Sequence, residues 1–277
     1  SSPRRRSPCL KILTRETDES MRVLCWVILA FFLVFLFMTA PSVRRGRARA
    51  WRGALFAHRG LHDETRAENS LAAFEAACRA GYGIELDVRY SKDGRLIVFH
   101  DDTLERMCGD KRRPEELTVA ELKALPLGNT QDRIPTFDEA LALIDGRAPL
   151  LVEIKNGRRI RALTADTAAR LRKYDGKYLI ESFNPLCLFY LRFMAGDVVR
   201  GQLVASREET EQTTGAALAI ALSGLLLNAL SRPDFVAYNI AAAMRRPCSG
   251  GCTERPWRRG RCVRRSSWRW RKSGGIW

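Results

Sequence analysis

The sequence from Leu55 onward alternates short apolar runs with amphipathic stretches, and this alternation restricts the possible fold most strongly. Helices are predicted over 70–81, between the later strands, and over roughly 213–230. Two capping boxes, Thr118 with Glu121 and Thr136 with Glu139, open two short helices. The predicted strands are 55–60, 83–91, 96–101, 150–155, 178–183, 199–204 and 234–238. Strands that alternate with helices indicate a parallel α/β domain. About 190 residues with seven strands fall short of a complete eight-stranded barrel.

An apolar run of eighteen residues without any charge lies before this domain, at 23–40. At 1.5 Å per residue it spans about 27 Å, just enough for the hydrocarbon core of a bilayer. A cleaved signal peptide is disfavoured by the five arginines between Arg44 and Arg52. A buried core helix is disfavoured because the run has no polar face. We therefore expect a single-pass anchor and a membrane location.

The net charge of +16 would suggest an anionic polymer as partner if the charge were evenly spread. Residues 1–52 carry 11 basic and 3 acidic residues, and residues 244–277 carry 11 and 1. The middle, 53–243, holds 25 basic against 27 acidic residues, so we expect no nucleic-acid partner. The expected division is a basic segment (1–22), an anchor (23–40), a basic linker (41–54), a catalytic domain (55–243) and a tail (244–277).

The side of the membrane depends on where the native chain starts. Met21 directly precedes the apolar run, and a start there would leave residues 1–20 outside the native protein. One arginine would then precede the run and five would follow, which favours a cytoplasmic domain. With residues 1–20 included, the basic counts are six and five and the orientation stays open.

The tail at 244–277 mixes Arg, Gly, Trp and Cys without helical or strand periodicity. Cys248, Cys252 and Cys262 form a weak zinc pattern because no His is nearby. A basic, aromatic tail is also compatible with nucleic-acid binding. We favour a shifted reading frame in a GC-rich gene, because one back-translation of 248–277 with GC-rich codons, shifted by two nucleotides, reads as a strand followed by a helix. The barrel would then be incomplete at its C-terminal end.

Three acidic residues lie on predicted strands of the domain. Glu85 and Asp87 are two apart on one strand, so their side chains point to the same face. Glu153 lies near the end of a later strand. These acids alone are also compatible with a solvated strand face. Carboxylates without thiolates suit a hard cation, so we expect Ca²⁺ or Mg²⁺.

Two of the three histidines, His58 and His100, follow predicted strands, although a His at a strand end is more often structural. In a barrel the catalytic face lies at the C-terminal ends of the strands, where both would meet the acids, Arg59 and Lys155. Two imidazoles suit acid–base cleavage of an ester, and Arg59 suits a phosphate oxygen. Glu68 fits a turn before the next helix as well as a substrate contact. Together these residues indicate metal-assisted phosphodiester cleavage.

The motifs resemble, in order and spacing, those of the glycerophosphodiester phosphodiesterase family over roughly 55–240. They are AHRG (57–60), EN (68–69), ELDV (85–88), SKDG (91–94), HDDTLER (100–106), IPTFDEAL (134–141) and EIK (153–155). LLLNALSRPDFVAY looks like the membrane-anchored bacterial members. The resemblance implies a barrel of the phosphatidylinositol-phospholipase-C type, hydrolysis to glycerol 3-phosphate and an alcohol, and a small or lysophospholipid substrate. It implies an acid–base pair (His58, His100), metal ligands (Glu85, Asp87, Glu153) and phosphate contacts (Arg59, Lys155).

The chain departs from the family pattern in two places. RAEN stands where PEN is common, which is a minor change. Family members continue with a WTV-type strand, a helix and a final strand where this chain has its basic tail. The shifted frame offers AAWTV at that point. An alternative interpretation is therefore an inactive or misfolded membrane-bound fragment whose barrel does not close.

Overall fold

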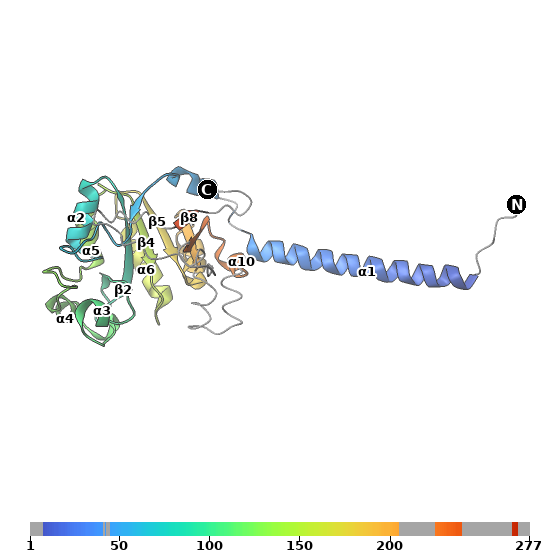
Figure 1. Ribbon diagram of the computed structural model, residues 1–277, viewed down its shortest axis with the longest axis horizontal. Coiled ribbons are helices and arrows are strands. Elements are labelled where there is room, and N and C mark those ends of the chain that lie inside the picture. Colours follow the sequence, from blue (N-terminus) through green and yellow to red (C-terminus); the bar gives the residue numbers. More distant parts are fainter. Residues whose placement is uncertain (1–7, 41, 43–44, 205–224, 240–267, 271–277) are drawn as a thin grey trace, which may run out of the picture.

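One curled, mostly parallel sheet organises the domain that follows the N-terminal helix (Figure 1). The computed structural model describes residues 8–40, 42, 45–204, 225–239 and 268–270. The parallel strands, in spatial order, are β1 (Phe56–Ala57), β2 (Gly83–Tyr90), β4 (Leu150–Ile154), β5 (Tyr178–Ser182), β6 (Arg200–Val204) and β7 (Phe235–Asn239). The predicted α/β class is therefore confirmed, and each predicted strand has its counterpart. The first is shorter than predicted, because the chain turns at Arg59 and Gly60, whose φ angles are +56° and +80°.

Two further strands pair with the sheet in the antiparallel direction. β3 (Leu96–Val98) pairs with β2 outside the main strand order, and β8 (Trp268–Trp270) pairs with β7 at the far edge. The tail, for which no strand was predicted, thus contributes this short strand. Among the described residues, no strand connects β8 back to β1, and the sheet forms an incomplete barrel.

Helices cover the outer face of the sheet. They are α2 (Leu71–Arg79), α5 (Phe137–Ile144), α6 (Ile160–Leu171) and α7 (Pro185–Met194), with α3 (Glu105–Cys108), η2 (Pro114–Glu116) and α4 (Val119–Ala124) in the β3–α5 connection. The outward residues of β2 and β4, such as Leu86 and Val152, are fully buried against Phe74 and Phe137. Both predicted capping boxes are present, at Thr118 and Thr136.

The inner face is apolar where β4 and β5 begin and along β6 and β7. Its cluster consists of Leu151, Leu179, Val199, Leu203, Phe235 and Ala237, with Ala48, Trp51 and Phe56 packed against it. Ala48 and Trp51 belong to η1 (Arg45–Trp51), a 3-10 helix within the stretch predicted as a linker. This helix packs against one end of the barrel interior, and the polar residues lie toward the other end.

The N-terminal helix α1 (Pro8–Thr39) begins upstream of the apolar run. Its segment Met21–Thr39 is long and apolar enough to cross a membrane, which a signal sequence would also be. Of the helix predicted over 213–230, residues up to 224 lie outside the described part. The described remainder leads into α10 (Asn228–Ser231), which contacts α1.

Candidate active site

Three buried carboxylates meet on the inner face of the sheet. Asp87 on β2 is the register neighbour of Glu153 on β4, and Glu85 lies two residues earlier on the same face. One carboxylate oxygen from each of the three lies within 4.8 Å of the others. Only 5%, 0% and 6% of Glu85, Asp87 and Glu153 are exposed. The strand register thus assembles the three acids that the sequence singled out.

The electrostatics of this cluster favour a bound cation. Burial raises the pKa of Glu85 well above its ordinary value, and the carboxylates of Asp87 and Glu153 raise it further. Burial also raises the pKa of Glu153, against the opposing effect of Lys155. Asp87 Oδ1 is buried and accepts no hydrogen bond from the described residues, although Lys155 Nζ lies 3.2 Å away. An oxygen-only donor set with excess negative charge fits Ca²⁺ or Mg²⁺.

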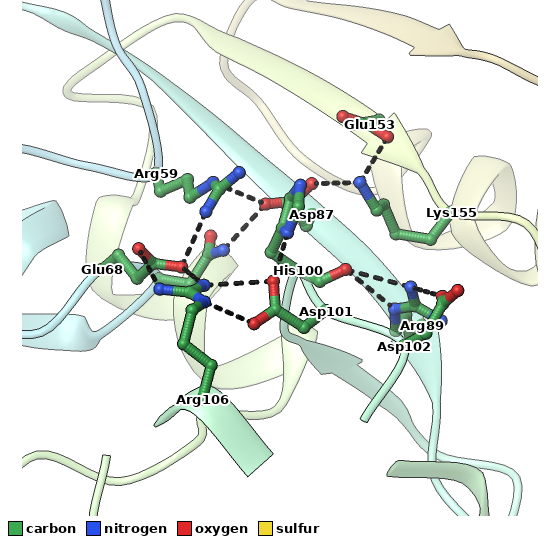
Figure 2. A network of polar contacts seen from close by, with 11 residues as sticks. Arg59, Glu68, Asp87, Arg89, His100, Asp101, Asp102, Arg106, Glu153 and Lys155 are labelled. Carbon is green, nitrogen blue, oxygen red and sulfur yellow. Dashed lines mark hydrogen bonds and ion pairs between the residues drawn. The ribbon is translucent and has the colours of Figure 1, made fainter. Parts of the chain in front are cut away.

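Lys155 is the buried counter-charge of the cluster. Its Nζ donates to Glu153 Oε1 at 2.7 Å and also pairs with Asp87 (Figure 2). Burial would lower the pKa of Lys155, but the two carboxylates outweigh it and raise this pKa. Burial would likewise raise the pKa of Asp87, yet Lys155, His100 and Arg59 hold it below its ordinary value. Asp87 and Lys155 are therefore both charged at neutral pH.

The turn after β1 directs Arg59 toward the acids. Its backbone N–H donates to Glu85 Oε2 at 2.7 Å, while Nη1 donates to Glu68 Oε1 at 2.8 Å. Its Nε lies 3.7 Å from Asp87 Oδ2. The next residue must be glycine, because a Cβ on Gly60 would lie 2.9 Å from the Cβ of Ala73 in a left-handed conformation. The AHRG motif thus encodes a tight turn that presents a guanidinium.

The EN motif contacts Asp87 and Arg59 and does not cap the following helix. Ser70 caps α2, since its side chain accepts the N–H of Ala73. Asn69, at a φ of +57°, donates Nδ2 to Asp87 Oδ2 at 2.8 Å. Glu68 is ion-paired with Arg59. Sequence reasoning left Glu68 open between turn and substrate contact and gave Asn69 no contact with Asp87.

His100 reaches the site by a different route from the one expected. The sequence placed it at the carboxyl end of a strand, but β3 runs antiparallel to β2, so its end points the other way. The chain returns along β2 to the level of Asp87, whose carbonyl accepts the N–H of Phe99. The His100 Nδ1 lies 2.6 Å from Asp101 Oδ1. Its backbone carbonyl accepts Nε and Nη2 of buried Arg89, at 3.2 and 3.0 Å.

Arg106 on α3 connects the two loops that carry Arg59 and His100. Its Nε donates to Asp101 Oδ2 at 2.6 Å, and its Nη1 donates to Glu68 Oε2 at 3.2 Å (Figure 2). A continuous chain of ion pairs and hydrogen-bond contacts therefore leads from Arg59 to His100. Sequence reasoning assigned Arg106 no role, although it ends the HDDTLER motif.

His58 directly follows β1, the strand that pairs with β2. Burial, helped by the positive charge of Arg59, lowers the pKa of His58 to about 4, against the attraction of Asp87. The imidazole is therefore neutral at pH 7, the form that accepts a proton.

A fourth buried acid, Glu181, was missed by sequence reasoning. It is the register neighbour of Glu153 on β5 and is 5% exposed. Burial raises the pKa of Glu181 well above its ordinary value, and the neighbouring carboxylates of Glu153 and Asp87 add to the effect. Its position near the end of the next parallel strand, in YLIESF, was the available signal.

Comparison with known proteins agrees with this arrangement. A glycerophosphodiester phosphodiesterase from Caldanaerobacter subterraneus subsp. tengcongensis is 33% identical over 160 residues, 54% of this chain and 65% of that protein. Human glycerophosphodiester phosphodiesterase 1 is 35% identical over 143 residues, 47% of this chain and 43% of that protein. The chain thus spans less than two thirds of the length of either relative.

Two solved phosphodiesterase structures are also similar to this chain. A phosphodiesterase from Oleispira antarctica, in complex with the product sn-glycerol-3-phosphate, matches with a TM-score of 0.54 and 27% identity, over 63% of this chain and 74% of that one. A glycerophosphodiester phosphodiesterase from Agrobacterium tumefaciens matches with a TM-score of 0.53 and 28% identity, over 70% and 79%.

Residues 58–242 match the profile of the glycerophosphoryl diester phosphodiesterase family. This segment is more than half of the chain, and it contains every site residue described above, from His58 to Glu181. The chain belongs to the glycerophosphoryl diester phosphodiesterase family.

Proposed function

We propose that this protein hydrolyses glycerophosphodiesters to glycerol 3-phosphate and an alcohol. The observation that carries the proposal is the convergence of three buried carboxylates with Arg59, Lys155 and His100 at one end of the sheet. The product named in the Oleispira antarctica complex, sn-glycerol-3-phosphate, supports the identity of the product. The names of the relatives support the same reaction.

The proposed roles follow from charge and hydrogen bonding. Arg59 binds a phosphate oxygen, and Lys155 adds positive charge beside it. His58 is neutral and accepts a proton from the attacking group. His100, with its Nδ1 held by Asp101, donates a proton to the leaving alcohol oxygen.

A divalent cation is proposed to complete this site. Glu85, Asp87 and Glu153 would hold it, and it would stabilise negative charge on the phosphate oxygens as a Lewis acid. The same carboxylates suit Ca²⁺ and Mg²⁺, so we propose a hard divalent cation of this class.

The membrane location is also a proposal. Met21–Thr39 is long enough to cross a bilayer, and we propose that it remains attached as an anchor. The arginines that follow it favour a domain on the cytoplasmic side when Met21 is the start. Both a soluble diester and a lysophospholipid are candidate substrates for an anchored enzyme.

The test uses the purified full chain with glycerophosphocholine, and it measures the release of glycerol 3-phosphate. We expect turnover that is lost with a chelator, restored by Ca²⁺ or Mg²⁺, and lost in His58→Ala and His100→Ala. Lys173→Ala, which changes an exposed residue just after α6, is the control and should keep full activity. Turnover that survives both the chelator and His58→Ala would contradict the mechanism.

An inactive fragment is the competing proposal, and the open sheet favours it. β1 has only β2 as a partner among the described strands, and β8 is a short antiparallel addition. A cooperative thermal transition together with diesterase activity would refute this alternative. Sequencing of the gene around codon 247 tests the separate proposal that the tail is read in a shifted frame.

A further inference from the structure

The last turn of α1 is attached to the domain by side chains of α10 and the turn that follows it. Arg232 Nη1 donates to the carbonyls of Ala40, at 3.0 Å, and Phe37, at 3.2 Å. The guanidinium also lies 4.5 Å over the Phe37 ring. Asn228, which is 2% exposed, donates Nδ2 to the carbonyl of Thr39 at 3.2 Å. Three hydrogen bonds, to the carbonyls of Phe37, Thr39 and Ala40, therefore cap the C-terminal end of α1.

These contacts supply hydrogen-bond donors and positive charge to the C-terminal end of α1. The last carbonyls of a helix have no partners within it and carry a partial negative charge. Arg232 supplies donors and a positive charge at that point, while its own backbone is held at a φ of +41°, a costly conformation for a residue other than glycine. Ser42, 6% exposed, then donates its N–H to the carbonyl of Pro233 at 2.9 Å. The helix end is thus held in a defined position on the domain.

The attachment lies at the opposite end of the strands from the active site. Arg232 and Pro233 precede β7, and Arg47 Nη1 donates to the carbonyls of Gly196 and Asp197, shortly before β6. These positions are at the N-terminal ends of parallel strands. Of the proposed site residues, Asp87 and Glu153 lie beyond the middle of β2 and β4, and Arg59 follows the end of β1. The strand register puts Phe235, at the start of β7, on the same row as Glu153 and Asp87, so Pro233 lies only about 7 Å before that row along the strand direction. The main separation is across the strands, because four strand spacings, about 19 Å along the curled sheet, separate β7 from β2.

The arrangement of the whole molecule agrees with this separation. Figure 1 shows α1 leaving the domain on the side of α10 and β8, while α2, α3, α4 and α5 lie on the other side. Arg106 of α3 and the turn that precedes α2 belong to the site. A bilayer around α1 would therefore face the α10 side of the domain.

We propose that Arg232 and Asn228 form a fixed mount between the membrane helix and the catalytic domain, which holds the active site away from the bilayer. The substrate is then a diester dissolved in water, with a small hydrated alcohol, and not a lysophospholipid within the membrane. This inference rests on the proposed diesterase function and on the proposed anchor. The headgroup layer extends only about 5–8 Å beyond the hydrocarbon core on each side. We expect a lipid phosphodiester held there to lie short of the site, because four strand spacings separate β7, beside the mount, from β2.

The mount also bears on signal-peptide cleavage. The domain contacts the end of the apolar run and the residues just after it through Arg232, Asn228 and Pro233. Their partners are Phe37, Thr39, Ala40 and Ser42. A cleavage near residue 40 would remove the partners of these groups. We therefore expect mass spectrometry of the purified chain to find α1 still attached.

The first test measures orientation and does not depend on activity. The full chain is placed in phosphatidylcholine nanodiscs with p-azidophenylalanine at Leu230 on α10 or at Glu105 on α3, each labelled with a donor dye. With acceptor-labelled lipid headgroups, we expect strong energy transfer from position 230 and weak transfer from position 105. Arg232→Ala with Asn228→Ala should reduce this difference, whereas Arg79→Ala on the surface of α2 should leave it unchanged. Equal transfer from both positions in the native chain would overturn the mount.

The second test compares two substrates that both release choline. We expect the chain in vesicles to hydrolyse dissolved glycerophosphocholine and to leave vesicle-bound palmitoyl lysophosphatidylcholine intact. The double variant Arg232→Ala, Asn228→Ala should gain turnover of the lipid while it keeps its turnover of the soluble diester. Comparable turnover of both substrates by the native chain would contradict the inference. Turnover of neither would contradict the proposed function alone, and the energy-transfer comparison would then decide the mount.

Discussion

The two ends of the barrel interior use the same strands for opposite purposes. Toward the N-terminal ends, Leu151, Leu179 and Trp51 form an apolar cluster that stabilises the fold. Two residues further along the same strands, Glu153 and Glu181 are buried with raised pKa values. The β-strand repeat of two residues thus places a stabilising layer directly beside a layer that is costly to bury. We expect substitutions at the two ends to have separable effects on activity and stability.

The largest effect is expected from Asp87→Asn. Removing this charge takes away one proposed metal ligand and the partner of Lys155, so kcat/KM should fall by at least about 10³-fold. Calorimetry should show that Ca²⁺ and Mg²⁺ binding is lost. Asp138→Asn, on the exposed surface of α5, is the matched control and should retain metal binding and activity. Retained metal binding in Asp87→Asn would exclude the proposed metal site.

At the apolar end, Leu179→Ala should lower the stability of the fold and leave the activity nearly unchanged. Leu179 is fully buried, and its truncation leaves a cavity that should cost about 2–4 kcal/mol of unfolding free energy. Activity per folded molecule should stay near that of the native chain, as measured by urea unfolding and by kcat at low temperature. A tenfold loss of kcat in the folded variant would show that the two ends are not separable.

More of the polar end than of the apolar end could be predicted from the sequence. The acids of the polar end were predictable because Glu85, Asp87 and Glu153 stand on strands, where a spacing of two residues fixes the face. Glu181 was predictable by the same rule once β5 is placed beside β4. By contrast, the contacts of Asn69 and Arg106 depend on where loops fold back, which no periodicity encodes. His100 was predicted at the site although the expected strand direction was wrong.

The apolar end was less predictable for a related reason. The arginine-rich composition of residues 41–54 is typical of a linker, but Trp51 and Ala48 pack against the barrel interior as part of η1. Two small or aromatic residues within a charged stretch give too weak a pattern to predict this packing. The contact of Arg232 with the end of α1 joins residues almost 200 positions apart and had no local signal.

Within the polar end, Arg106→Ala should test whether the ion-pair network positions Arg59 and His100. The variant breaks the ion-pair chain between Glu68 and Asp101, so Arg59 and His100 are no longer held in one arrangement. A misplacement of about 1 Å can cost up to about 10²-fold, and we expect kcat/KM to fall by about 10- to 100-fold. Arg106→Lys should recover part of the loss in kcat. Arg112→Ala, whose side chain pairs only with the nearby Asp110 among the described residues, is the matched control. Unchanged kinetics in Arg106→Ala would show that the network has no positioning role.

The smallest expected effect is on the pH dependence of stability, and it should come from His58 at the polar end. His58 has a pKa of about 4 in the folded chain and about 6.5 when unfolded, so the unfolded state binds more protons between these values. Stability of the metal-free chain should therefore be fully present above pH 6.5 and fall as the pH approaches 4, with about 1–3 kcal/mol attributable to His58. His58→Gln should lose this part of the pH dependence, while Leu179→Ala should keep it. Thermal melts across this range provide the measurement, and a pH dependence in His58→Gln identical to that of the native chain would show that the imidazole is not buried in its neutral form.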